Sequence, residues 1–280
     1  MAKTAPAATT PDHTTPCGNL ALMSAPRVLL VVPTLGTRPD FLRQCLTSIA
    51  EQDVAADIVI VAPDKPEIHE IAREFNASHL ADPGSQSSAI NLGVASAQAH
   101  HEFVNWIGDD DLLEPGSLRA TTAALDADPH AVVAYGACRY IDENDSELWI
   151  SRAGPWANRI LKWGPDLIPQ PGMLVKTAAW QKAGGVDESL RFAFDLDLLL
   201  KLQQQGALID VGQVVSSFRW HADSLTVGDR TASLDESERV KRRALSPMAR
   251  KLAWIWENPV RGATRLAARE VARRAQRATA

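Results

Sequence analysis

The first half of the chain alternates short apolar runs with amphipathic segments. The apolar runs have the length of buried strands and lie at residues 27–32, 57–61, 78–80 and 102–107. The segments between them carry apolar residues at helical spacing and lie at residues 39–50, 67–75 and 85–97. Strands that alternate with helices predict an α/β fold with a doubly wound, mostly parallel sheet flanked by helices.

The second half of the chain is less regular. We expect strands at residues 131–137, 173–176 and 208–218, and helices at residues 178–183 and 196–205. A long irregular segment, residues 142–171, separates the first of these strands from the second. Residues 1–25 are rich in Ala, Thr and Pro without periodicity, which predicts a disordered leader.

Composition narrows the class of protein. Hydrophobic residues make up 45% of the 280 positions and charged residues 22%, which is typical of a folded soluble protein. The apolar runs are far shorter than the ~20 residues that a membrane-spanning helix needs. The three cysteines, Cys17, Cys45 and Cys138, are widely spaced, which argues against a disulfide framework and favours the cytoplasm.

Charge divides the chain into an acidic body and a basic tail. From Arg239 onward there are twelve basic and two acidic residues, a balance of +10, whereas the residues before it carry −15. An acidic body argues against a nucleic-acid partner. We expect a basic helical tail over residues 231–280, with helices starting at Ser246-Pro247 and Asn258-Pro259.

The tail combines interfacial aromatic residues with regularly spaced arginines. The first predicted helix carries Trp254 and Trp256, and in the second an arginine recurs every four residues from 261 to 277. Such a segment favours an anionic membrane surface, here the inner face of the plasma membrane. The alternative is that the basic tail docks on its own acidic body or on a partner subunit.

Three adjacent carboxylates, Asp109, Asp110 and Asp111, follow the apolar run that ends at residue 107. Loops after strands 27–32, 57–61 and 102–107 should converge at the carboxyl edge of the sheet, where ligands bind in such folds. Adjacent carboxylates repel one another unless a cation is present, and oxygen ligands suit Mg²⁺ or Mn²⁺. The alternative is a solvated loop in which Asp111 caps a helix that opens at Leu112.

Several ordered blocks resemble family 2 glycosyltransferases of the GT-A fold. The Pro-Thr turn and following helix of residues 33–52 resemble the family's opening, and Asn91-Leu92-Gly93 resembles its Arg-Asn-x-Gly helix. Residues 106–118 resemble its DXD strand, and later blocks follow in the expected order at 185–188, 195–198 and 218–221. The resemblance implies a GT-A domain over residues 26–230, with a nucleotide-sugar half at 26–115 and an acceptor half at 116–230.

The resemblance also implies an activity and a set of ligands. It implies an inverting glycosyltransferase that moves a sugar from a nucleotide-diphosphate sugar to a saccharide or lipid-linked acceptor, in the synthesis of surface polysaccharide or glycolipid. The implied metal ion is Mn²⁺ or Mg²⁺, held by Asp110, Asp111 and His221. The implied donor-binding residues are Pro33, Thr34, Arg38, Asp64, Asn91 and Asp109.

Two positions depart from the family pattern. Alignment on Pro115 places Gly108 where the family has the first Asp of its metal motif, so that Asp110 takes the position of the main metal ligand. The second strand ends in Val-Ala-Pro-Asp in place of Val-Asp-Asp-Gly-Ser, and Asp64 replaces the base-contacting Asp from a shifted position.

Asp195 is the candidate catalytic base, because the resemblance aligns it with the Asp of the family's Glu-Asp pair. A carboxylate there can take the proton of the acceptor hydroxyl. The alternative is that Asp195 caps the helix expected at 196–205, with Asp197 as a first-turn acid. For His221, the alternative to a metal ligand is a structural histidine.

The irregular segment carries Trp149, Trp156 and Trp163, in the region where the family builds its acceptor side. Aromatic faces can stack on sugar rings, so these three are candidate acceptor-binding residues, and ordinary packing is the alternative.

Other functions fit the sequence less well. A sugar-nucleotide pyrophosphorylase is suggested by Gly36-Thr37-Arg38, but Pro39 interrupts that motif. A dinucleotide oxidoreductase lacks a G-x-G-x-x-G after the first strand. A non-catalytic nucleotide-sugar-binding scaffold, recruited to membranes by its tail, would not need Asp195.

Overall fold

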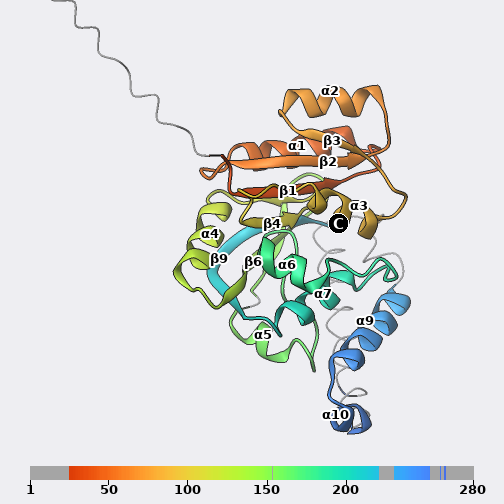
Figure 1. Cartoon of the computed structure of the whole chain (residues 1–280). Coiled ribbons are helices and arrows are strands. Elements are labelled where there is room, and N and C mark those ends of the chain that lie inside the picture. Colours follow the sequence, from red (N-terminus) through yellow and green to blue (C-terminus); the bar gives the residue numbers. More distant parts are fainter. Residues whose placement is uncertain (1–24, 153, 221–229, 253–258, 260–261, 263–280) are drawn as a thin grey trace, which may run out of the picture.

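The structure, a computed structural model, describes residues 25–152, 154–220, 230–252, 259 and 262 (Figure 1). The first part of the chain alternates strands and helices as the hydrophobic pattern predicts. In chain order its elements are β1 (Val28–Pro33), α1 (Pro39–Ala50), β2 (Ala56–Ala62), α2 (Pro66–Glu74), β3 (Ser78–Ala81), α3 (Gln86–Ala95), β4 (Phe103–Trp106), β5 (Leu112–Leu113) and α4 (Ser117–Ala127).

The later part contributes longer strands and further helices. These are β6 (Ala131–Ile141), β7 (Glu147–Ser151), α5 (Trp156–Ile160), β8 (Leu174–Lys176), α6 (Thr177–Ala183), α7 (Phe194–Leu202), β9 (Ala207–Arg219), α9 (Arg230–Ala244) and α10 (Pro247–Leu252). The expected irregular segment thus contains β7 and α5. None of the described helices is both long and apolar enough to cross a membrane.

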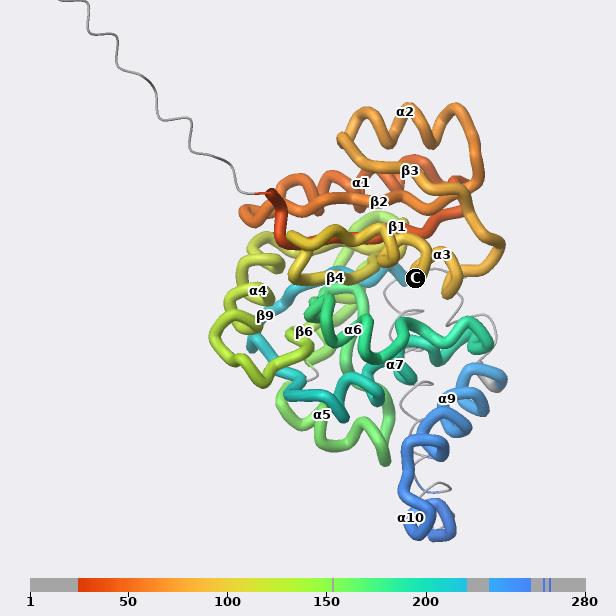
Figure 2. The backbone as a smooth tube through the Cα atoms, viewed as in Figure 1, coloured from red at the N-terminus to blue at the C-terminus, as the bar shows by residue number. Residues whose placement is uncertain are grey.

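All described strands join one sheet, in the order β3-β2-β1-β4-β8-β6-β9-β5, with β7 paired to β6. The strands β3, β2, β1 and β4 are parallel, and so are β6 and β9, whereas β8, β5 and β7 pair antiparallel to their neighbours. Because β1 and β2 are parallel neighbours, their carboxyl ends meet at one edge. The tube view shows the two strands side by side (Figure 2). The predicted α/β fold is therefore confirmed.

Two hydrophobic cores cover the two faces of the sheet. In β1, Leu29 and Val31 face the core that includes α3, α6, α7 and α9, whereas Val28, Leu30 and Val32 face the core that includes α1, α2 and α4. Burial on both faces explains why β1 reads as a continuous apolar run and not as an alternating pattern. Because helices cover both faces of the sheet, polar loops lie at the ends of the strands.

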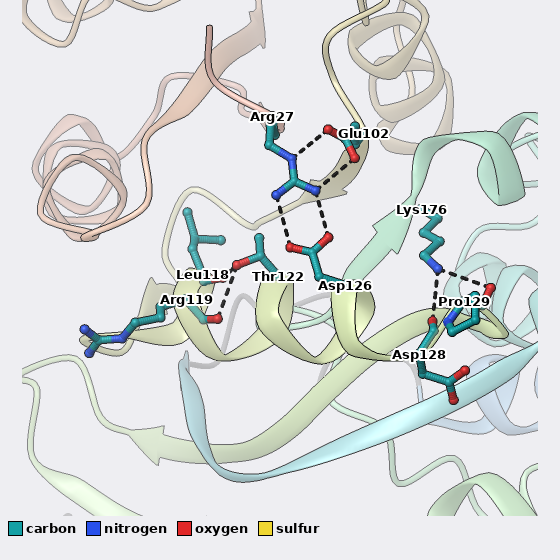
Figure 3. A network of polar contacts seen from close by, with 9 residues as sticks. All are labelled: Arg27, Glu102, Leu118, Arg119, Thr122, Asp126, Asp128, Pro129 and Lys176. Carbon is teal, nitrogen blue, oxygen red and sulfur yellow. Dashed lines mark hydrogen bonds and ion pairs between the residues drawn. The ribbon is translucent and has the colours of Figure 1, made fainter. Parts of the chain in front are cut away.

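A cluster of charges fixes the amino ends of two parallel strands, at the edge opposite the candidate site (Figure 3). The guanidinium of Arg27, next to β1, donates to both carboxylate oxygens of Glu102, next to β4, and to both of Asp126 in α4, at 2.7–3.0 Å. These hydrogen bonds raise the pKa of Arg27 and lower the pKa values of Glu102 and Asp126. Arg27 thereby joins the amino ends of β1 and β4 to α4.

One local expectation from sequence is wrong. Leu112 and Leu113 do not open a helix but form β5, which pairs with Ser216 and Ser217 of β9. The helix α4 begins five residues later, after Gly116 in the left-handed region at φ +76°. Asp111 is therefore not a helix cap, and its carboxylate accepts the N–H of Arg219 instead.

The helix α9 packs against the core that contains α7. Val240 is buried in the same core as the leucines of α7, and Leu245 is 6% exposed. Lys241 Nζ donates to the carbonyl of Gly164, and Arg243 lies 3.6 Å from Asp187. The following α10 has no buried residue among those described, and Trp254, Trp256 and the arginine stripe lie outside the described residues.

Candidate active site

The Asp109–Asp111 segment lies at the carboxyl end of β4, where it meets the loop that follows β1. Thr34 Oγ1 donates a hydrogen bond to Asp109 Oδ2 and accepts one from Gly36 N. Arg38 lies 3.4 Å from Asp109 Oδ1 and 3.2 Å from Asp110 Oδ2. The structure thus brings together Pro33, Thr34, Arg38 and the aspartates, which the sequence places more than 70 positions apart.

The helix α1 holds the aspartate segment through residues on one of its faces. Cys45 Sγ donates to the carbonyl of Gly108 at 3.4 Å, and Ser48 Oγ accepts the N–H of Leu113 at 3.0 Å. Two residues after α1 ends, the Gln52 side chain donates to the carbonyl of Glu114 and accepts the N–H of Leu118. The Ser-Ile-x-x-Gln pattern of the sequence therefore acts by fixing the backbone after the aspartates.

Arg219 is the buried centre of this arrangement. Its side chain is 0% exposed and lies over the Phe41 ring at 4.3 Å. It donates to the Asp110 carbonyl at 3.0 Å and to Gln44 Oε1 at 2.8 Å, and it pairs with Asp145 at 2.6 Å. Sequence reasoning missed this role, although Arg219 precedes His221 in a block that it did identify.

The carboxylates of Asp110 and Asp111 converge on the space above Gly108. A Cβ at position 108 would stand 2.9 Å from Asp110 Oδ1 and 2.9 Å from Asp111 Oδ2. Burial, followed by the charge of Asp110, raises the pKa of Asp111 well above its ordinary value. Two converging carboxylates are the donor set that Mg²⁺ or Mn²⁺ uses, so these residues fit a divalent cation, and Gly108 leaves them the room. His221, the third expected ligand, lies outside the described part of the chain.

A second set of metal-ligating atoms lies at the opposite edge of the sheet. Asp57, His100 and His101 place one ligand atom each within 4.8 Å of one another. However, His101 Nδ1 accepts the N–H of Gln98 at 2.9 Å, so the ring proton of a neutral imidazole sits on Nε2, which faces Asp57 Oδ2 at 2.8 Å. Since metal binding at Nε2 would require that proton to move and the Gln98 bond to break, we interpret this group as structural.

Two expected donor-binding residues make local contacts. Asp64 has an exposed side chain that pairs with His69 of α2 at 2.5 Å, and this hydrogen bond lowers its pKa. Asn91 of α3 accepts the N–H of Val186 at 3.0 Å and donates to the Val186 carbonyl and to Glu188, both at 2.9 Å. Asn91 thus holds the loop before α7, and a donor contact for either residue stays a prediction.

Asp195 lies in the first turn of α7, which begins at Phe194, one residue before it. It is therefore not the helix cap of the alternative interpretation. Its Oδ1 accepts the N–H of Leu196 at 2.7 Å, and burial raises its pKa to about 6. Burial and then the charge of Asp195 raise the pKa of Asp166 to about 7, so the two carboxyls influence each other. Sequence reasoning did not select Asp166, because nothing in its own segment links it to Asp195.

The three tryptophans differ in their surroundings. Trp149 stacks on Tyr140, with ring centroids 4.3 Å apart and an interplanar angle of 14°, and it contacts Trp220 edge-on at 5.8 Å. Trp156 and Trp163 are 66% and 43% exposed, and the Arg159 guanidinium lies 4.8 Å over the Trp156 ring. The Trp149 ring is thus packed against other aromatic rings, whereas Trp156 and Trp163 are partly exposed to solvent.

Comparison with known proteins gives a consistent result. The model of "Glycosyl transferase family 2" matches residues 29–179. O-antigen biosynthesis protein RfbC of Myxococcus xanthus is 28% identical over 243 residues, which are 80% of this chain and 18% of RfbC. Uncharacterized glycosyltransferase RT0329 of Rickettsia typhi is 23% identical over 226 residues, 76% of this chain and 70% of that protein. The chain spans only about a fifth of RfbC and about a quarter of the relative y4gI of Sinorhizobium fredii.

Solved structures share the fold at low identity. TarS of S. aureus in complex with UDP-GlcNAc is 16% identical with a TM-score of 0.59, over 81% of this chain and 70% of that one. Mannosyltransferase PcManGT from Pyrobaculum calidifontis, in complex with GDP-Man and Mn²⁺, is 16% identical with a TM-score of 0.60, over 82% and 69% of the two chains. The described sheet and its flanking helices thus form a GT-A type fold.

Proposed function

The chain belongs to glycosyl transferase family 2, and from this premise we propose that it transfers a sugar from a nucleotide-diphosphate sugar to an acceptor hydroxyl, with inversion at the anomeric carbon. One observation carries the proposal. The aspartate segment after β4 is tied by Thr34 and Arg38 to the loop after β1, at the sheet edge where GT-A folds bind nucleotides. The proposal also includes the class of donor, the class of acceptor and the need for a metal ion.

Different residues of this chain orient the donor and take up the proton of the acceptor. Arg38 and the Thr34 loop orient the diphosphate of the donor beside Asp109. Asp195 takes the proton of the acceptor hydroxyl while that oxygen forms a bond to the anomeric carbon. The bond from the anomeric carbon to the diphosphate breaks on the opposite face, and the electron pair leaves with the nucleoside diphosphate. No covalent bond between the sugar and the protein is needed.

Asp110, Asp111 and His221 are the residues that would hold Mn²⁺ or Mg²⁺. When bound there, the cation supplies charge stabilisation for the leaving diphosphate. This assignment is supported by the convergence of Asp110 Oδ1 and Asp111 Oδ2 above Gly108, and the relative with bound GDP-Man carries Mn²⁺.

We assign the acceptor to the saccharides or lipid-linked saccharides of surface polysaccharide synthesis. The similarity to RfbC, an O-antigen biosynthesis protein, supports this class. On this chain, the exposed parts of Trp156 and Trp163 offer stacking surface for sugar rings.

The proposed function is tested by incubating the full-length chain with UDP-, GDP- and dTDP-sugars, with and without Mn²⁺. We expect at least one donor to raise the melting temperature in the presence of Mn²⁺, because a ligand that binds only the native state stabilises it. The same donor should release its nucleoside diphosphate faster when polysaccharide or lipid-linked acceptors are added. If no donor is bound and none is consumed, the proposed function is wrong.

We also propose that the basic tail binds anionic lipid at the cytoplasmic face of the membrane. The residues after Leu252 support this, because they carry six arginines against two acidic residues together with Trp254 and Trp256, and each basic group near such a surface is worth about 1 kcal/mol. We expect the full-length chain to co-sediment with anionic vesicles at low salt and to dissociate at high salt. A chain truncated after Leu252 should stay in solution. Equal co-sedimentation of both chains would place the membrane contact elsewhere.

A further inference from the structure

A buried carboxylate of α9, that of Glu236, accepts hydrogen bonds from the backbone directly before α7. Glu236, 5% exposed, accepts the backbone N–H of Phe192 at 2.5 Å and that of Ala193 at 3.0 Å through Oε2. The N–H of Arg191 lies 3.2 Å from both of its carboxylate oxygens. Three consecutive N–H groups therefore share one acceptor from a helix more than forty residues later.

This contact supplies what the start of α7 lacks locally. Ala193 is the residue that precedes the first turn, and its side chain offers no capping oxygen. Of the three N–H groups that Glu236 accepts, that of Ala193 belongs to the cap position of α7, and those of Arg191 and Phe192 belong to the segment directly before the helix. The N-terminus of a helix carries a partial positive charge, so a carboxylate is favourable at this place. Glu236 therefore holds the segment that leads into α7.

The loop between α6 and α7 is thereby held from two sides. On the α3 side, Asn91 bonds both the N–H and the carbonyl of Val186. Gly185, at φ +74°, has no room for a Cβ, which would stand 2.4 Å from Asn91 Oδ1. On the α9 side, Glu236 holds residues 191–193, directly before the turn that contains Asp195.

We propose that Glu236 is a positioning residue for the transfer reaction, because it fixes the first turn of α7 and with it the direction of the Asp195 carboxylate. The inference rests on the proposed function, in which Asp195 is the base. It gives α9, the first helix of the predicted tail, a part in the chemistry of the acceptor half.

The charge of Glu236 also affects the pKa of Asp195, which can be measured through the pH dependence of turnover. The negative charge of Glu236 adds to burial in raising the pKa of Asp195. The other groups that act on this carboxyl pair are Asp166, whose pKa is raised by Asp195, and Lys241, which acts on Asp166 from α9. Removing the charge of Glu236 should therefore move the acid limb of the turnover profile to lower pH.

The test compares Glu236→Gln with Glu236→Asp and with Asp235→Asn, an exposed neighbour on the same helix. We expect Glu236→Gln to lower kcat by about 10-fold or more, since small misplacements of a reacting group have effects of this order. The donor KM should change by less than about twofold, because ground-state donor contacts remain. Glu236→Asp, which keeps the charge, should lower kcat without moving the acid limb, and Asp235→Asn should match the wild type.

Hydrogen exchange tests the contact without relying on activity. In the full-length chain, the amides of residues 191–193 should exchange faster in Glu236→Gln than in the wild type or in Asp235→Asn. Unchanged exchange, or a Glu236→Gln variant with wild-type kcat and acid limb, would overturn the inference. A wild-type chain that consumes no donor would instead refute the proposed function, and the exchange result would still decide whether Glu236 fixes this turn.

Discussion

Replacing Asp195 by asparagine should lower turnover by about 10²–10⁴-fold, the range associated with the loss of a general base. Asparagine has nearly the same shape and can still accept the N–H of Leu196, so α7 should remain in place. Donor affinity should be nearly unchanged, because the donor contacts lie on the loops after β1 and β4. The measurement is kcat from release of nucleoside diphosphate, with donor KM as the internal reference.

The matched control is Asp197→Asn, two residues further along the same helix. Asp197 forms an ion pair with Lys201 at 2.8 Å within α7, so its carboxylate has a structural role that needs no part in catalysis. We expect this variant to retain turnover within a few-fold of the wild type. If Asp195→Asn turns over as fast as Asp197→Asn, Asp195 is not the base.

The pH dependence follows from the same carboxyl group. A base must be ionised to accept a proton, and burial raises the pKa of Asp195 to about 6. Turnover should therefore be constant above about pH 7 and fall tenfold per pH unit well below pH 6. The charge of Asp195 in turn raises the pKa of Asp166, which burial already places higher, so Asp166 loses its proton after Asp195. An acid limb near pH 4 in the wild type would contradict the assignment.

The parts of the fold that the sequence predicted well are those in which local pattern and burial agree. The bounds of α1 match the predicted 39–50, because Leu42, Cys45, Leu46 and Ile49 are all buried on one face and Pro39 starts the helix. For β1 the prediction was within one residue at each end, because every residue of this strand is buried. The bounds of α1 and β1 could be predicted because they follow from the pattern of residues that are adjacent in sequence.

The sequence could not predict features that depend on distant partners. Leu112 and Leu113 look like a helix start before Pro115, yet they pair with β9, about a hundred residues later. The role of Arg219 depends on Gln44, Asp110 and Asp145, which lie on three separate segments. Nothing in the local pattern around Arg219 indicates this set.

The tail shows how a charge count can hide a packing signal. Counting charges favoured a membrane surface for the residues after 230 and left docking on the acidic body as the alternative, and in α9 Glu236 and Val240 are indeed buried against the body. Their spacing of four, with Ala244 four residues later and packed on the same core, is the signal that could have indicated a buried face. The burial of the Glu236 carboxylate could not be predicted in this way, because its partners are backbone N–H groups next to α7, more than forty residues earlier in the chain.

Replacing Asp110 by alanine should abolish the part of donor binding that depends on Mn²⁺. The Asp110 side chain is 17% exposed and pairs with Arg38, whereas the contact to Arg219 uses its main-chain carbonyl, so the variant should keep the fold. In the wild type, a donor at about 100 times its Kd should add about 2.7 kcal/mol to the free energy of unfolding when Mn²⁺ is present. In Asp110→Ala this increment should disappear.

Two further variants separate the metal site from general effects on the fold. Asp53→Asn removes an exposed carboxylate that pairs with Arg119 on the surface, and it should keep the full Mn²⁺-dependent increment. Asp111→Ala should lower the melting temperature even without donor, because it leaves the buried N–H of Arg219 without its carboxylate, a cost of about 1–3 kcal/mol. Equal Mn²⁺-dependent stabilisation in Asp110→Ala and wild type would show that Asp110 is not a metal ligand. The Asp110 carboxylate would then serve to balance Arg38, and that of Asp111 to hold the N–H of Arg219.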